Sequence, residues 1–169
     1  MTNPPAGRVV PTAAGRDLIL HRTFRAPIED VWASITESDR TARWYGQWKG
    51  EPGVGRTIQV QMAFEEGAGW SDMRIDACDP PRRLALYAAD DYGVWSLDLE
   101  LTQQDEITTL RFTHHLDDKA EVENVGPGWE YYLDAMVSAY NDGPRPNFDD
   151  YYPAMKAYYE AQDSGSGAS

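Results

Sequence analysis

Alternating apolar and polar residues recur along the middle of the chain and predict a series of strands. Every second residue from 95 to 101 is apolar, and a similar run follows from 108 to 116 after a short polar turn. The same period occurs over 58–64 and 72–77, and residues 84–88 form a short apolar run. A period of two is typical of strands with one buried face. Because the intervening turns are too short for helical crossovers, we expect an antiparallel meander.

The first part of the chain predicts one strand followed at once by two short helices. Residues 17–24 have strand character and end at Ala26-Pro27. Proline fits the first turn of a helix, where its missing N–H costs nothing. Apolar residues then recur at helical spacing from Ile28 to Ile35. Ser38 is a candidate N-cap for a second short helix that ends near Tyr45-Gly46.

A long helix is predicted near the end of the chain. It starts at Gly126-Pro127-Gly128, carries an apolar stripe from Trp129 to Tyr140, and stops at Gly143-Pro144. A Tyr-rich helical segment follows within residues 144–162. We expect this extension to dock on the domain and cover the mouth of a cavity, or else to bind a partner protein.

The order of elements predicts an α+β fold in one domain, in which a curved antiparallel sheet of six or seven strands wraps around the long C-terminal helix. Such an arrangement can leave a hollow between sheet and helix. The domain is expected over residues 9–143, with a flexible lead over 1–8, the helical extension over 144–162 and a disordered, low-complexity tail over 163–169.

Charge and cysteine content exclude several classes of function. The 169 residues carry a net charge of -13, which repels phosphate backbones and anionic lipid surfaces, so we expect neither nucleic acid nor membrane as a partner. Cys78 is the single cysteine, so no internal disulfide is possible. No signal peptide is visible and the protein reads as cytoplasmic. No metal site is expected, because adjacent His114 and His115 project to opposite faces, and no cofactor is indicated.

Several short motifs, taken in order, resemble the START-like helix-grip superfamily, also called SRPBCC or Bet v 1-like. Within it they are most similar to the domain named after the C-terminal part of the activator of Hsp90 ATPase. The matching residues are Arg22-Thr23-Phe24, Ala26-Pro27, Val31-Trp32, Trp44-Tyr45-Gly46, Val54-Gly55, Asp79-Pro80-Pro81-Arg82-Arg83-Leu84, Thr108 to His115, Gly128-Trp129 and Leu133. The resemblance covers about residues 17 to 140.

The resemblance implies a helix-grip fold with an elongated cavity, and no single activity. The superfamily includes lipid carriers, hormone receptors and aromatase/cyclases, and fold alone does not settle function. Asp105-Glu106 replaces the Gly-Gly turn that often precedes the last strand in this family. The segment after Gly143 lies outside the usual domain end. Nothing in the chain matches the large N-terminal domain of the co-chaperone, so Hsp90 activation does not transfer with the family name.

The inward faces of the predicted strands and of the long helix supply the candidate ligand-binding residues. Ligand sites are mostly apolar walls with a few polar groups that fix orientation. Trp44 and Trp70 lie near predicted turns and could form the rim, and His114 is the inward polar group. The full candidate set is Trp44, Met62, Phe64, Trp70, Met73, Trp95, Leu97, Leu99, Phe112, His114, Trp129, Tyr132, Leu133 and Met136. For the aliphatic members, ordinary core packing is the more common role.

Three functions remain open on the sequence. The first is binding of a small hydrophobic or aromatic ligand in the internal cavity. The second is an enzyme of cyclase or dehydratase type that uses His114 as acid or base. The third is a protein-interaction module of the chaperone-regulator kind, with an exposed patch of Trp48, Trp70 and the Tyr151-Tyr152 pair.

Overall fold

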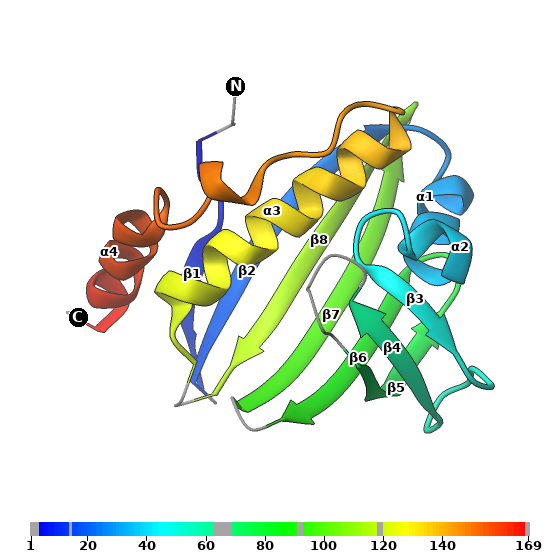
Figure 1. Ribbon diagram of the computed structural model, residues 1–169, viewed down its shortest axis with the longest axis horizontal. Helices are drawn as coiled ribbons and strands as arrows, with labels where there is room; N and C mark the ends of the chain where they lie inside the picture. The colour runs from blue at the N-terminus through cyan, green and yellow to red at the C-terminus, as the bar shows by residue number, and fades with distance from the viewer. Residues whose placement is uncertain (1–3, 14, 63–68, 91–92, 118–119, 168–169) are drawn as a thin grey trace.

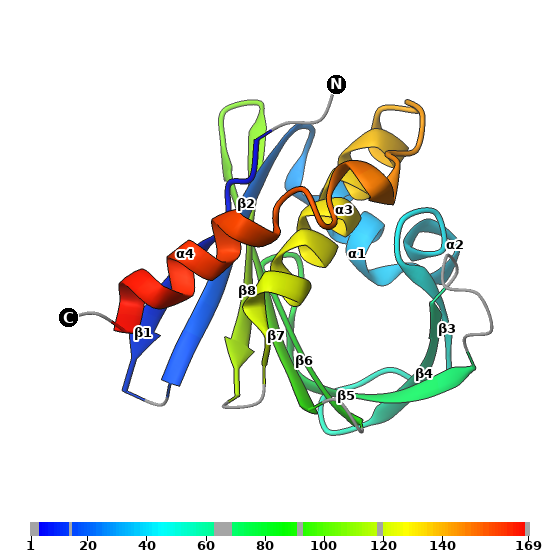
Figure 2. The ribbon, with the colours of Figure 1, turned by 60° about the vertical axis from the view of Figure 1, so that its left-hand side comes forward.

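The computed structural model describes residues 4–13, 15–62, 69–90, 93–117 and 120–167. One open antiparallel sheet curves around a long helix, α3 (Val122–Tyr140), which lies across its concave face (Figures 1 and 2). The order of the strands in the sheet is β1-β2-β8-β7-β6-β5-β4-β3, so the β3–β8 meander meets the first two strands at β8. The expected α+β helix-grip architecture is confirmed.

The sheet contains eight strands, one or two more than the sequence predicts. They are β1 (Arg8–Thr12), β2 (Gly15–Arg25), β3 (Gly46–Lys49), β4 (Thr57–Met62), β5 (Trp70–Asp79), β6 (Arg83–Asp90), β7 (Gly93–Gln104) and β8 (Ile107–Leu116). β3 is not among the predicted strands. It has only four residues, with Gly46 and Trp48 inward, so its alternation is too short to predict a strand.

The helices differ from the prediction mainly at their ends. They are α1 (Ile28–Thr36), α2 (Ser38–Thr41), α3, the 3₁₀ turn η1 (Phe148–Asp150) and α4 (Lys156–Gly167). The second short helix ends at Thr41, not near Tyr45. The long helix begins at Val122, so Pro127 lies inside it rather than at its start. α4 reaches Gly167 and thus enters the segment predicted as a disordered tail.

The core lies where α3 crosses β2, β7 and β8. Apolar residues at alternate positions of these strands face the helix, because residues opposite each other in an antiparallel pair share one face. Leu18 pairs with His114, Leu20 with Phe112, and Leu99 with Phe112 on the other side. From the helix, Leu133 and Met136 are at most 1% exposed. Sheet and helix are therefore in full contact over this half of the molecule.

The extension after α3 packs on the domain, on the side of α3 that is remote from β3 and β4. Tyr151, Met155 and Tyr159 are buried, and α4 contacts both β1 and α3. Figure 2 shows α4 beside β1, with α3 between it and the strands β3 and β4. The extension therefore covers the β1 side of the molecule and not the space between α3 and β3–β4.

Candidate functional site

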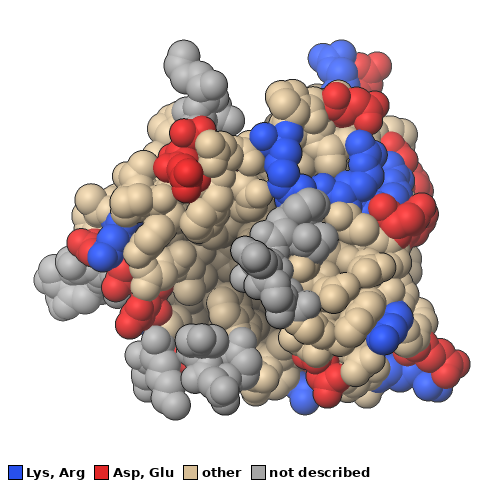
Figure 3. All heavy atoms as spheres, in the orientation of Figure 1, with Lys and Arg blue, Asp and Glu red and all other residues tan. Residues whose placement is uncertain are grey.

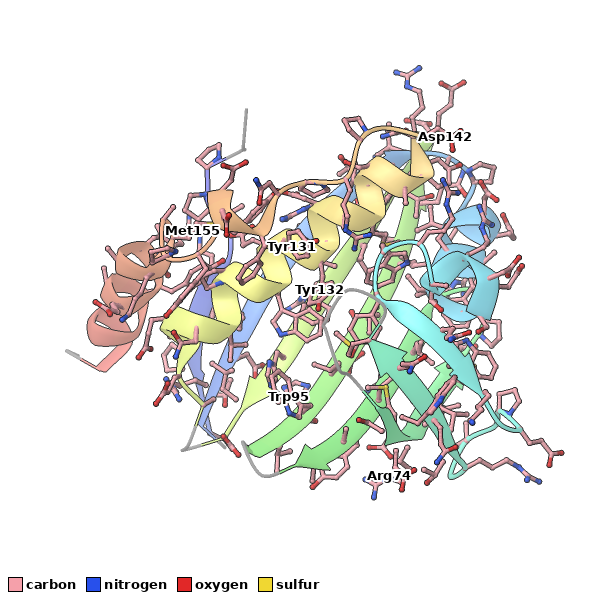
Figure 4. The ribbon with its side chains drawn as sticks, viewed as in Figure 1. Arg74, Trp95, Tyr131, Tyr132, Asp142 and Met155 are labelled. Carbon is pink, nitrogen blue, oxygen red and sulfur yellow. The ribbon has the colours of Figure 1, made fainter. Side chains whose placement is uncertain are left out.

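Between α3 and the other half of the sheet lie six apolar or aromatic side chains that are only partly buried where they pack against the core. They are Tyr45, Met62, Leu86, Ala88, Trp95 and Tyr132, and each is half-buried. We call this set the inner apolar surface. The face seen in Figure 3 is recessed between α3 and the strands β3 and β4. In Figure 4, Tyr132 lies on the side of α3 that faces the sheet, above Trp95.

Trp129 holds the aromatic members of this surface together. Its ring stacks with that of Tyr45 at 6.2 Å between centroids and 8° between planes. The ring of Trp95 lies edge-on at 6.4 Å, and those of Tyr132 and Phe112 are tilted against Trp129 at 6.1 Å and 4.4 Å. Such offset and edge-to-face contacts are the favoured aromatic geometries. Trp129 is 6% exposed, so it acts as the support behind the half-buried rings.

Strand pairing places the floor of the inner apolar surface. Ala88 pairs with Trp95 and Leu86 with Leu97, so these side chains all point to the concave face. Ala88 and Trp95 are both half-buried at this pair, whereas Leu97 on the next inward position is buried. Met62 follows from β4, where Ile58 and Val60 on the same face are buried.

His114 lies behind Trp95 and is saturated with hydrogen bonds. Its Nδ1 accepts a hydrogen bond from Nε1 of Trp129 at 3.1 Å, and its Nε2 lies 3.4 Å from the carbonyl oxygen of Val94. The indole N–H can only donate, so the proton of the neutral ring is on Nε2. Burial lowers the pKa of His114 from 6.5 to about 4. The residue is therefore neutral near pH 7, and both of its nitrogens are engaged.

The structure brings some of the predicted site residues together and leaves others in the core or elsewhere. Met62, Trp95 and Tyr132 belong to the inner apolar surface. Trp44 donates its indole N–H to the Ser34 carbonyl at 2.9 Å and is 6% exposed. The remaining core members are Met73, Leu97, Leu99, Phe112, His114, Trp129, Leu133 and Met136. Phe64 lies outside the described residues.

Trp70 points away from this group. It pairs with Gln61 on the outer face of the sheet, is 38% exposed, and carries the ammonium of Lys49 over its ring at 4.0 Å. Trp48, in contrast, faces inward and donates its N–H to the Thr36 carbonyl. Tyr151 is 2% exposed. The aromatic residues expected to form a chaperone-type patch therefore lie at separate places in the structure.

Sequence reasoning missed three members of the inner apolar surface: Tyr45, Leu86 and Ala88. The run from 84 to 88 is apolar at most positions, so no period of two marks which side chains face inward. Tyr45 follows the short helix α2, and helical spacing does not extend to it. The Trp44-Tyr45-Gly46 motif was the available signal, because two adjacent aromatic residues leaving a helix must point in different directions.

A second polar centre, which the sequence did not suggest, lies on the opposite side of α3. Glu130 is 2% exposed and accepts hydrogen bonds from the backbone N–H groups of Ala6 at 2.7 Å and Gly7 at 3.1 Å. It also accepts from Arg22 at 2.8 Å and from the hydroxyl of Tyr159 at 2.5 Å. A buried carboxylate needs this number of donors to offset its lost hydration.

One turn further along α3, Asp134 extends this polar centre. Its carboxylate accepts from Arg22 at 2.9 Å and from the hydroxyl of Tyr151 at 2.7 Å. Burial and the neighbouring carboxylates raise the pKa of both Tyr151 and Tyr159 well above 10. The centre thus ties the N-terminal segment, β2 and the C-terminal extension to one helix, and its role is structural.

Two hollows lie at the edges of the molecule. One of about 120 Å³ is lined by Arg43, Ala135, Ser138, Ala139, Gly143 and Arg145. Another, of about 370 Å³, lies at the β1–β2 turn and contains the Asp17–His115 pair, whose atoms are 2.8 Å apart. Within the described part of the chain, no three His, Cys, Asp or Glu side chains are grouped as metal ligands. No helix in that part is both long and apolar enough to span a bilayer.

The chain belongs to the family of activator of Hsp90 ATPase homolog 1-like proteins, because the family model matches residues 25–141. The START-like resemblance is thereby confirmed. No curated protein matches the sequence.

Among solved structures, CalU16 from Micromonospora echinospora is similar in its crystal form at 24% identity, with a TM-score of 0.72 over 93% of this chain and 95% of that one. The protein encoded by BPP1335 from Bordetella parapertussis is 23% identical, with a TM-score of 0.73 over 95% and 94%. DynU16, described as a protein in the dynemicin biosynthetic locus, is 22% identical with a TM-score of 0.66. The match covers 78% of this chain and half of DynU16. These likenesses establish the fold.

Proposed function

We propose that the protein binds a small hydrophobic or aromatic molecule between α3 and the β3–β7 part of the sheet. The observation that carries the proposal is the inner apolar surface itself. Large apolar side chains normally close on one another in a core packed to crystal-like density. Here Trp95 and Tyr132 remain half-buried on facing elements, whereas the core residues of the neighbouring β2–β8 half of the same sheet are fully buried under α3.

The chemistry of this surface sets the class of ligand. Aromatic rings and a methionine thioether offer wide, polarizable contact area that suits flat or irregular apolar molecules. Supporting rings behind the surface, centred on Trp129, keep it preorganised, which lowers the entropy cost of binding. A role toward a small organic molecule is also in keeping with DynU16, whose description places it in a biosynthetic locus.

The contacts of His114 favour binding over catalysis. A general acid or base must reach the proton that it transfers. Trp129 and Val94 engage the two nitrogens of His114, and Trp95 covers the ring, with centroids 5.2 Å apart. His114 therefore supports the aromatic rings of the surface. Its contacts do not support the alternative of a cyclase-type enzyme.

A direct test uses the neutral fluorescent probe N-phenyl-1-naphthylamine with two substitutions on one strand. Ala88→Phe places a ring on the inner apolar surface, and Ala89→Phe places the same ring at the next, exposed position. We expect saturable binding by the wild type, at least about tenfold weaker binding by Ala88→Phe, and unchanged binding by Ala89→Phe.

Thermal melts of both variants separate a blocked surface from a damaged fold, because an overpacked core would lower the melting temperature. Equal affinity of Ala88→Phe and wild type would refute the proposed location. An absence of saturable binding to the wild type across a panel of neutral aromatic probes would refute the function.

A further inference from the structure

The hollow of about 120 Å³ beside α3 is lined by two arginines, Arg43 and Arg145. Arg43 comes from the connection between α2 and β3, and Arg145 from the segment that follows α3. Figure 3 shows Lys and Arg side chains over this part of the molecule, with Asp and Glu side chains beside them. The chain as a whole carries 28 acidic and 15 basic residues, so two guanidinium groups at one hollow run against the overall charge.

The hollow lies next to the inner apolar surface. Ala135 lines it and stands three residues after Tyr132, and side chains three apart on a helix are neighbours. From the other side, Arg43 is two residues before Tyr45, whose ring is 5.5 Å from that of Tyr132. Arg145 donates to the hydroxyl of Tyr131 at 2.9 Å, and the Tyr131 ring is 5.3 Å from Tyr132.

The hollow of about 120 Å³ is partly open to solvent and has room for the head group of an acid. Guanidinium groups bind carboxylate, sulfonate and phosphate oxygens through charge-assisted hydrogen bonds, which are among the stronger polar contacts in proteins. Ser138 adds a hydroxyl to the lining.

We propose that Arg43 and Arg145 bind the acid group of an amphipathic ligand whose aromatic part lies on the inner apolar surface. This inference rests on the proposed function and narrows it: the ligand is an aromatic or apolar organic acid rather than a neutral hydrocarbon. The acid group sits about one helical turn along α3 from the ring that contacts Tyr132.

Asp142 is the competitor of the acid group. Its carboxylate is 3.0 Å from Arg43, in a pair whose side chains are 51% and 86% exposed. Such an exposed pair contributes little and is readily exchanged for another anion. Asp142 has φ 55°, a left-handed conformation that asparagine also tolerates, so Asp142→Asn removes the competing charge without straining the turn.

The alternative is that both arginines serve only the C-terminal end of α3, where cations offset the negative end of the helix dipole. The two roles are distinguished by the ratio of the affinities for a negatively charged and a neutral probe of the same aromatic structure. The probe 8-anilinonaphthalene-1-sulfonate carries the same two aromatic units as N-phenyl-1-naphthylamine plus one sulfonate. We therefore compare the dissociation constants of both probes for each variant, with circular dichroism and melting temperature as folding controls.

The wild type is expected to bind the sulfonate probe at least about tenfold tighter than the neutral one, despite the net negative charge. The double variant Arg43→Gln/Arg145→Gln should lose this preference and keep its affinity for the neutral probe. Arg25→Gln/Arg56→Gln, at exposed ion pairs elsewhere, changes the net charge equally and should keep the preference. Asp142→Asn should strengthen binding of the sulfonate probe alone.

Equal affinity of the wild type for the two probes would overturn the inference while leaving the proposed function intact. So would an unchanged preference in Arg43→Gln/Arg145→Gln with a lowered melting temperature, which is the result expected for helix-end arginines. If the double variant does not fold, Asp142→Asn decides: unchanged sulfonate binding overturns the inference. Failure of the neutral probe to bind any form of the protein counts against the proposed function instead.

Discussion

At the scale of single residues, His114 shows how a chemically suggestive side chain can be structural. Its position in the alternating run predicts that it points inward, and it does, with 1% exposure. What the sequence cannot show is that Trp129 and Val94 occupy its two nitrogens, because both partners are remote in sequence. The exposed neighbour His115 instead pairs with Asp17.

The depressed pKa of His114 predicts a dependence of stability on pH. In the unfolded chain the ring takes up a proton near pH 6.5, whereas in the folded protein its pKa is about 4. Between these values the unfolded state binds more protons, so the stabilisation present above pH 6.5 is lost as pH falls toward 4. The free energy of unfolding should drop by about 2 kcal/mol between pH 7 and pH 4.5 from this group.

The measurement is urea denaturation at both pH values for wild type and His114→Gln. Glutamine offers a donor and an acceptor but does not titrate, so the difference between the two proteins isolates the histidine from the carboxylates that titrate in the same range. An equal loss of stability in both proteins would contradict the burial and neutrality assigned to His114.

At the scale of elements, α3 packs through two faces, one against the sheet and one against the C-terminal extension. One carries Trp129 and Leu133 against the sheet, and its period identified the helix in the sequence. The other carries Glu130 and Asp134, and acidic side chains are mostly exposed in proteins. The extension changes this, because Tyr151 and Tyr159 supply donors that make the burial of those carboxylates tolerable.

Two glycines of α3 test the docking of the extension. Alanine is normally better than glycine in a helix by about 0.5–1 kcal/mol. At Gly128 nothing lies within 4 Å of an added Cβ, so Gly128→Ala should gain about that amount. At Gly126 the added Cβ would be 2.6 Å from the ring of Tyr159, so Gly126→Ala should lose about 1–3 kcal/mol.

The check is chemical denaturation of the two variants together with limited proteolysis of the extension. Gly126→Ala should speed cleavage within residues 144–162, because the Tyr159 ring is displaced, and Gly128→Ala should not. Stabilisation of both variants would show that the extension does not pack on Gly126 in solution.

The hydrophobic pattern of the sequence predicts the long strands and helices correctly. It does not predict the shortest strand, or which side chains face inward in a run that is apolar throughout. The runs 95–101 and 108–116 became β7 and β8 in the expected pairing, because each has one buried face. The strand β3 and the floor residue Ala88 escaped detection, the first for its four residues and the second for lying in a run with no polar alternation. The sequence therefore predicts a fold with aromatic side chains that face inward. Which residues form the inner apolar surface follows only from the structure.

At the scale of the whole molecule, the sheet divides into a closed half and an open half. The strands β2, β7 and β8 each have a hydrogen-bonded neighbour on both sides and pack against α3. In contrast, β3 is an edge strand of four residues. Strands with few buried contacts open locally at lower free-energy cost. Amide hydrogen exchange should therefore be slowest in β7 and β8 and faster in β3 and β4.

A ligand on the inner apolar surface must stabilise the half that it touches, because binding lowers the free energy of the closed, bound state relative to opened ones. With saturating N-phenyl-1-naphthylamine, exchange should slow by several-fold in β3, β4 and the α2–β3 connection, and remain unchanged in β1 and α4. Hydrogen-exchange mass spectrometry of wild type with and without the probe measures this, and Ala88→Phe should show weaker protection at the same probe concentration. Protection confined to β1 and α4 would place the ligand on the wrong side of α3 for everything proposed about Tyr132 and Trp95.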